Sequence, residues 1–152
     1  MTDTATPRTD PGLGDLRFPI DLRIPSDVRF IEPIVGAVVL CCAEEALPAR
    51  ACRLNVPVAL TEALSNAILR GNLEDRGKNV RFRATLDDRA LVLEVEDEGA
   101  GFDLEACLVV PREGDTVHRE DGRGLFLMQS LMDRVERVPA DVNVVRLTLH
   151  RT

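Results

Sequence analysis

Two runs of alternating apolar residues, separated by a short polar turn, limit the folds that are open to this chain. The first run consists of Val80, Phe82, Ala84 and Leu86, and the second of Leu91, Leu93 and Val95. Successive side chains of a β-strand point to opposite faces, so each run predicts a strand with one buried face. Asp87-Asp88-Arg89 supplies the turn between them. We therefore expect an antiparallel hairpin whose apolar face is covered by other elements.

The remaining apolar patterns predict helices and two further strands. In chain order, the expected elements are an edge strand over residues 18–24, helices over 26–45 and 51–70, the hairpin over 80–95, a helix from Leu125 to about Val138 and a closing strand over 142–149. Pro19 places the first strand at an edge, because proline removes a donor from the ladder. Pro57 predicts a kink, or a helix start near Asn55. This order predicts an α+β two-layer sandwich, in which helices cover one face of a mixed, mostly antiparallel sheet.

The length and charge of the chain narrow its class. The chain has 152 residues and a net charge of −7. Residues 1–14 lack periodicity, so we expect a flexible tail followed by one domain over residues 15–152. The acidic charge argues against a nucleic-acid-binding protein, since such proteins displace counterions with Lys and Arg. No apolar run approaches the roughly 20 residues of a membrane span, and the N-terminus lacks a signal-peptide core. We expect a cytoplasmic protein.

Two familiar kinds of site are not indicated. The four cysteines have neither a zinc spacing nor the pattern of a secreted disulfide framework, so buried, reduced thiols are favoured. A P-loop requires Gly-Lys followed by Ser or Thr, and Gly77-Lys78-Asn79 does not supply it. A bound nucleotide would therefore need another architecture.

The helix expected over residues 51–70 carries a polar stripe. Glu62, Asn66 and Arg70 are four residues apart and so project from one face. A solvent-exposed face is the ordinary explanation. Asn66 also invites a functional one, because asparagine is a poor helix former in mid-helix. A carboxylate and an amide oxygen one turn apart suit Mg²⁺ and the activation of a hydroxyl group.

A glycine-rich loop follows the second strand of the hairpin, over residues 97–103. Gly99 and Gly101 would let the backbone turn and approach a ligand closely, and Asp97 could accept hydrogen bonds at the end of the strand. An ordinary Asp-Gly turn explains this segment equally well when it is taken alone.

A third segment, Gly122-Arg123-Gly124, opens the helix that is expected from Leu125. The free N–H groups and the dipole of a helix N-terminus favour phosphate. Arg123 adds a permanent planar charge that suits phosphate oxygens. A flexible loop that enters a helix is the alternative.

Together and in this order, the three segments resemble the nucleotide-binding motifs of the GHKL ATPases, which include gyrase, Hsp90, histidine kinases and MutL. More narrowly, the chain looks like the anti-sigma-factor serine/threonine kinases of bacterial partner switching. The resemblance covers residues 16–152. It is carried by Ile24-Pro25-Ser26, Glu62–Ile68, Asp97–Asp103, Gly122–Met128 and Leu131-Met132-Asp133.

The resemblance implies ATP and Mg²⁺ as cofactors and a role for each matching residue. Asn66 and Glu62 would hold Mg²⁺, and Glu62 would also orient or deprotonate the attacking hydroxyl. Asp97 would bind the adenine amino group. The other implied nucleotide contacts are Gly99, Gly101, Phe102, Gly122, Arg123, Gly124 and Leu125, with the phosphates under a lid of residues 104–121. The implied catalytic set is Glu62, Arg70 and Arg123.

The resemblance also implies partners. The substrate would be a serine or threonine of a STAS-domain anti-sigma antagonist, and the second partner would be a sigma factor. A homodimer through the sheet or the first helix is implied as well, without direct contact to nucleic acid or membrane.

Two departures from the family pattern leave alternatives open. Arg70 stands where the family commonly has histidine, and Asp141-Val142-Asn143 lacks the glycine often found before the last strand. The change at Arg70 favours a nucleotide-binding module that sequesters a partner without phosphoryl transfer. A histidine-kinase catalytic part is a further alternative. It would need a separate substrate chain, because His118 and His150 lie on no expected dimerising helix.

Overall fold

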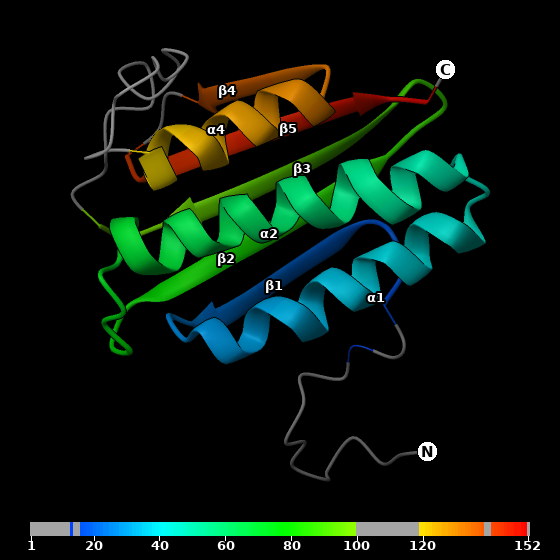
Figure 1. Ribbon diagram of the computed structural model, residues 1–152. Helices are drawn as coiled ribbons and strands as arrows, with labels where there is room; N and C mark the ends of the chain where they lie inside the picture. The colour runs from blue at the N-terminus through cyan, green and yellow to red at the C-terminus, as the bar shows by residue number, and fades with distance from the viewer. Residues whose placement is uncertain (1–12, 14–15, 100–118, 139–140, 152) are drawn as a thin grey trace, which may run out of the picture.

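The computed structural model describes residues 13, 16–99, 119–138 and 141–151. This part of the chain forms two layers, with helices on one face of a five-stranded sheet of order β1-β2-β3-β5-β4 (Figure 1). The strands are β1 (Ile20–Pro25), β2 (Asn79–Leu86), β3 (Ala90–Asp97), β4 (Arg134–Val138) and β5 (Asn143–His150). The α-helices are α1 (Ile31–Glu44), α2 (Val56–Asn66) and α4 (Arg119–Leu131). All the strand pairings are antiparallel, and the expected α+β class is confirmed.

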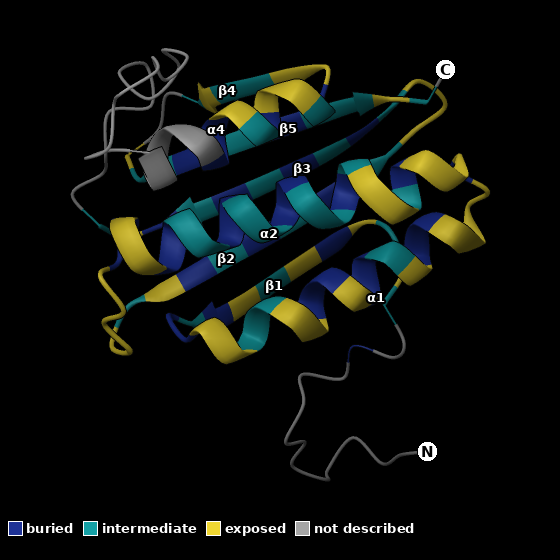
Figure 2. Cartoon of the chain, in the orientation of Figure 1, coloured by how far each residue is buried: buried dark blue, intermediate teal, exposed yellow. Residues whose placement is uncertain are grey.

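The predicted hairpin forms the centre of the sheet. In the β2–β3 pair, Phe82 lies opposite Val95 and Ala84 lies opposite Leu93. These side chains face the helices and are buried, as the dark blue core of Figure 2 shows. Fully burying a side chain such as Phe82 contributes about 1.5–3 kcal/mol relative to leaving it exposed. The alternation in the sequence therefore decides which face of the sheet receives the helices.

Short irregular turns precede the first two α-helices. Asp27 caps a 3₁₀ turn at Val28–Phe30 by accepting a hydrogen bond from the Arg29 amide, and α1 follows. A π-helical turn at Ala51–Asn55 precedes α2, which places Pro57 in the first turn of that helix. Proline is tolerated there because the first N–H groups of a helix have no partner within it.

The prediction for residues 125–138 is wrong at both ends. Helix α4 begins at Arg119 and ends at Leu131, and residues 134–138 form the edge strand β4, which sequence analysis missed. Asp133, two residues after the end of α4, explains why the chain changes from helix to strand. Its amide donates to the Thr148 carbonyl (2.8 Å), and its Oδ2 accepts from the His150 amide (2.6 Å). Pairing with β5 thus overrides the helical pattern.

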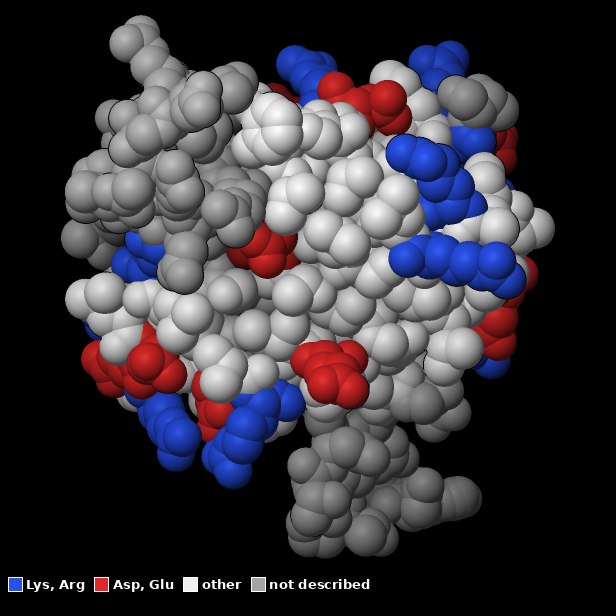
Figure 3. Space-filling view, viewed as in Figure 1, with Lys and Arg blue, Asp and Glu red and all other residues white. Residues whose placement is uncertain are grey.

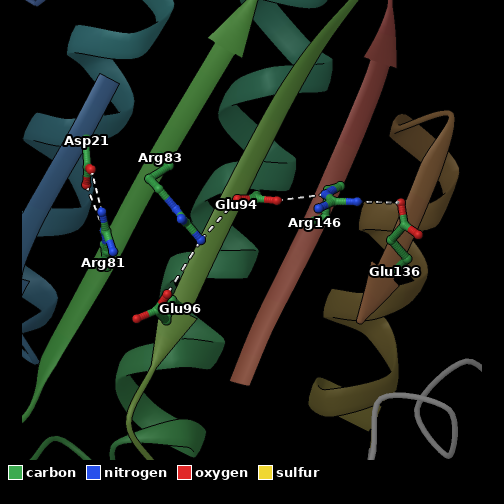
Figure 4. Close-up of polar contacts among 7 residues, drawn as sticks. All are labelled: Asp21, Arg81, Arg83, Glu94, Glu96, Glu136 and Arg146. Carbon is green, nitrogen blue, oxygen red and sulfur yellow. Dashed lines mark hydrogen bonds and ion pairs between the residues drawn. The ribbon is translucent and has the colours of Figure 1, made fainter. Parts of the chain in front are cut away.

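The sheet face that points away from the helices carries ion pairs across the strands (Figure 4). Glu94 lies at the centre, with Oε1 3.1 Å from Arg83 Nη2 and Oε2 2.7 Å from Arg146 Nε. A separate pair joins Arg81 to Asp21 at 2.6 Å. Partly exposed pairs of this kind each contribute modestly to stability, and they make this face polar. The apolar residues that alternate with them face the helices.

The opposite side of the molecule has a different character. Figure 3 shows a largely uncharged surface over α1 and α2. Within the described residues, no helix is both long and apolar enough to cross a membrane.

The described cysteines are free thiols, as expected. Cys41 and Cys42 are buried, whereas Cys52 is only partly buried. Burial raises the pKa of Cys42 to about 12. Such a thiol stays protonated at neutral pH and is a poor nucleophile.

Candidate functional site

The polar stripe lies on α2, the middle helix of the layer between α1 and α4 (Figure 1). Glu62 and Asn66 are half-buried, and Arg70, in the π-helical turn Ala67–Gly71 that follows α2, is exposed. Their neighbours Leu64 and Ile68 are fully buried against the sheet. Within the described part of the chain, the side chains of Glu62 and Asn66 have no hydrogen-bonding or ion-pairing partner. The stripe therefore presents two oxygen-bearing side chains beside the core.

Glu62 brings the third predicted segment to this stripe. Its carboxylate lies against Gly124 of α4, where a β-carbon would stand only 2.8 Å from Glu62 Oε1. Helices α2 and α4 run side by side in Figure 1. A glycine is required for this approach unless the carboxylate moves.

Asp97 brings the second segment to the other end of the stripe. Its side chain lies on the same face of β3 as those of Leu93 and Val95, towards the helices, and it is only 3% exposed. Its carboxylate packs against Gly71, leaving no room for a β-carbon there. Gly71 ends the π-helical turn after α2. The same helix thus meets α4 through Glu62 and the end of β3 through Gly71.

Hydrogen bonds hold the Asp97 carboxylate in place. Oδ1 accepts from the Gly99 amide (2.9 Å) and from Asn143 Nδ2 (3.0 Å), and Asn143 Nδ2 also donates to the Gly99 carbonyl (2.8 Å). Among the described residues, Oδ2 accepts no hydrogen bond. Burial raises the pKa of Asp97, although these hydrogen bonds and the charges of Arg137 and Lys78 act in the opposite direction. The site therefore contains a desolvated carboxylate with one oxygen engaged.

Two residues of this arrangement are not predicted from the sequence. Asn143 was noted only where a glycine was expected, yet β5 pairs it directly with Asp97. Its position two residues before Val145, in an alternating run, was the available signal. No functional role is predicted for Asn72 from the sequence, yet it is 1% exposed and its Oδ1 accepts a hydrogen bond from the Glu98 amide at 2.8 Å.

Part of the predicted site lies outside the described residues. This holds for Gly101, Phe102, most of the expected lid and the Arg123 side chain. The expected loop Gly122-Arg123-Gly124 is instead helical, because α4 already begins at Arg119. Leu125 is buried in the core. The unpartnered N–H groups at the start of α4 therefore belong to the turn that begins at Arg119.

Residues 24–149 match the sequence profile of the histidine kinase-like ATPase domain family. The anti-sigma F factor of Clostridium acetobutylicum is 34% identical over 83 residues, which are 54% of this chain and 57% of that protein. The anti-sigma F factor of Bacillus velezensis is 31% identical over 98 residues, 62% of this chain and 67% of that protein. The serine-protein kinase RsbW of Bacillus subtilis is 34% identical over 86 residues, 53% of this chain and 54% of that protein. The chain thus spans little more than half the length of two of these relatives.

Proposed function

This chain belongs to the histidine kinase-like ATPase domain family, and on that premise we propose that it is an ATP- and Mg²⁺-dependent serine/threonine protein kinase that acts as an anti-sigma factor. Its substrate would be a STAS-domain antagonist, its second partner a sigma factor, and its place of action the cytoplasm. A homodimer is part of the same proposal. The names of the relatives, anti-sigma F factor and serine-protein kinase, support it.

One observation carries the proposal: three segments far apart in the sequence meet along α2. Glu62 of α2 contacts Gly124, and Gly71 after α2 contacts Asp97. A nucleotide that lies along this line would have its base near Asp97 and its phosphates near Glu62 and the first turns of α4. Gly122 lies in the first of those turns, where unpartnered N–H groups and the helix dipole favour anions, and Arg123 follows it.

The residues on α2 fit a magnesium ion. Mg²⁺ prefers hard oxygen ligands and is usually bound by one or two protein groups together with substrate phosphates and water. Glu62 and Asn66 offer a carboxylate and an amide oxygen one helical turn apart. Bound Mg²⁺ would supply neutralisation of phosphate charge. Asn66 would hold the metal, and Glu62 would orient the attacking hydroxyl and accept its proton.

Asp97 suits adenine because of its unused oxygen. An adenine amino group donates hydrogen bonds, and Oδ2 of Asp97 would accept one while Oδ1 stays bonded to Gly99 and Asn143. Guanine presents a carbonyl oxygen at the same place, which a carboxylate repels. We therefore expect the site to prefer ATP to GTP.

A specific observation favours a second candidate function. Arg70, where the family commonly has histidine, is exposed at the end of the stripe. Arginine in place of histidine at this position would leave nucleotide binding intact but remove phosphoryl transfer. The chain would then be a nucleotide-binding module that sequesters its partner.

Calorimetry with ATP and ADP, with and without Mg²⁺, tests nucleotide binding. The native chain should bind ATP more tightly when Mg²⁺ is present. Asn66→Ala should lose this Mg²⁺ dependence and keep its fold by circular dichroism. Ser65→Ala is the matched control, since the adjacent residue on α2 projects about 100° away. If Asn66→Ala binds Mg-ATP as the native chain does, the metal assignment is wrong.

Incubation with labelled ATP and a cognate STAS-domain protein separates the two candidate functions. A kinase gives a phosphoprotein whose phosphate survives acid, as phosphoserine does and phosphohistidine does not. Glu62→Gln should keep ATP affinity and lose the transfer. Measurable ATP affinity without any phosphoprotein would support the sequestering module instead.

A further inference from the structure

A buried asparagine stands where the chain leaves the π-helical turn after α2. Asn72 is 1% exposed, and its amide closes that turn by donating to the Ala67 carbonyl at 2.8 Å. The next two residues, Leu73 and Glu74, have φ values of 53° and 56°. L-residues with side chains rarely adopt this left-handed conformation. The chain therefore reverses sharply just after Asn72, while Asn72 stays inside the protein.

The Asn72 side chain joins segments that are distant in the sequence. Its Nδ2 donates to Ser26 Oγ (2.8 Å), between β1 and α1, and to the Asn79 carbonyl (3.0 Å), at the start of β2. Its Oδ1 accepts from the Glu98 amide (2.8 Å), directly after β3. Both ends of the amide group are thus engaged, which a buried polar group requires.

The bond to Glu98 fixes the backbone beside the adenine carboxylate. In the turn that follows β3, the Gly99 amide bonds to Asp97 and the Gly99 carbonyl bonds to Asn143. Asn72 supplies the bond to the middle residue, Glu98. The Glu98 carboxylate also accepts from the Asn79 amide at the start of β2 (2.5 Å), but Asn72 supplies the bond to the backbone amide of Glu98, which no residue of β5 reaches among those the structure describes.

We propose that Asn72 is a positioning residue for base recognition, which holds the turn after β3 so that the Asp97 carboxylate is presented to adenine. This inference rests on the proposed nucleotide site. Gly71 and Asn72 act as a pair: the first packs against the carboxylate itself, and the second bonds to the next amide along the chain. A group that is held in place before the ligand arrives discriminates more strongly than one that must be ordered on binding.

Base selectivity distinguishes positioning from mere support of the fold. In Asn72→Ala, we expect the ratio of ATP affinity to GTP affinity, measured by calorimetry, to fall about five- to tenfold, as the loss of one well-placed hydrogen bond implies. Ser26→Ala is the matched control. It removes the hydroxyl that accepts from Asn72 and donates to the Lys78 carbonyl at 2.8 Å, but leaves the bond to Glu98. Its ratio should stay at the native value. Equal ratios in Asn72→Ala and the native chain, or equal losses in both variants, overturn the proposal.

Amide hydrogen exchange tests the same contact without nucleotide. The Glu98 amide should exchange at least about fivefold faster in Asn72→Ala than in the native chain and in Ser26→Ala. Asn72→Asp keeps the acceptor oxygen for the Glu98 amide but loses the donor to Ser26 and to the Asn79 carbonyl. It should therefore melt at a lower temperature than the native chain and still retain slow exchange and native base selectivity. Fast exchange in Asn72→Asp overturns the inference. A native chain that binds no nucleotide would instead refute the proposed function, while the exchange rates still report whether Asn72 holds the turn.

Discussion

Replacing Gly124 by alanine should separate phosphoryl transfer from folding. A β-carbon at residue 124 would lie 2.8 Å from Glu62 Oε1, whereas ordinary contacts begin near 3.4 Å, so the carboxylate must move by about 0.6 Å. Gly124 lies inside α4, where alanine is about 1 kcal/mol more favourable than glycine. The end of a glutamate side chain is flexible and yields easily. The substitution should therefore leave stability unchanged or raise it, while displacing the proposed catalytic group.

The expected result is a loss of rate without a loss of binding. Misplacement of a catalytic group by about 1 Å can cost roughly 100-fold in rate, so we expect transfer from labelled ATP to a STAS-domain protein to fall by about ten- to 100-fold. ATP affinity, measured by calorimetry, should change by less than about threefold, since Glu62 stands beside the phosphates rather than the base. The melting temperature should rise by up to about 2–4 °C.

Gly36 offers a matched control for the gain in helix propensity. It lies within α1, and a β-carbon there would meet no heavy atom within 4 Å. Gly36→Ala should raise the melting temperature to a similar degree and leave transfer unchanged. A native transfer rate in Gly124→Ala would refute the role of Glu62. Equal losses in both alanine variants would show that helix rigidity, and not the carboxylate, sets the rate.

Three further predictions concern charge and packing. Burial raises the pKa of Asp97, so the ionised carboxylate destabilises the fold at neutral pH. Asp97→Asn should therefore raise the melting temperature at pH 7, and this gain should disappear as the pH falls through the raised pKa. The same variant should bind ATP weakly by calorimetry. Hydrogen bonds from the Arg29 side chain and amide lower the pKa of Asp27 from 3.8 to about 2. The stability that they provide should be complete above pH 4 and lost towards pH 2, and thermal melts of Asp27→Asn should lack this dependence. Leu64 is fully buried, and Leu64→Ala should cost about 2–5 kcal/mol in urea unfolding.

The sequence predicts most of the sheet because its strongest pattern is local. Alternation in residues 80–95 determines the hairpin, its buried face and, by simple continuation, the inward position of Asp97. The spacing of Glu62 and Asn66 places both on one face of α2 in the same way. These features depend on a few neighbouring residues, so they can be derived without knowledge of the tertiary structure.

Features that depend on distant partners could not be derived. Strand β4 exists because Asp133 and the residues after it pair with β5, and the pattern of residues 125–138 taken alone favoured a helix. The role of Asn72 depends on three partners that lie 7, 26 and 46 residues away along the chain. An asparagine after a glycine signals a helix end in any protein, so nothing local marked it as buried.

The two glycines that complete the site are needed for the space that they leave. The sequence predicts Gly124 at a phosphate-binding helix start and assigns no functional role to Gly71, yet each glycine lies against a carboxylate, that of Glu62 or of Asp97. Packing against a helix backbone restricts where an acidic side chain can point without engaging the oxygens that a ligand needs. A hydrogen bond from the protein would restrict it equally but would occupy a lone pair. Close contact with glycine therefore restricts the Glu62 carboxylate without engaging its oxygens, and at Asp97 it leaves Oδ2 available while hydrogen bonds hold Oδ1. A single methyl group at residue 124 should accordingly impair transfer more than binding.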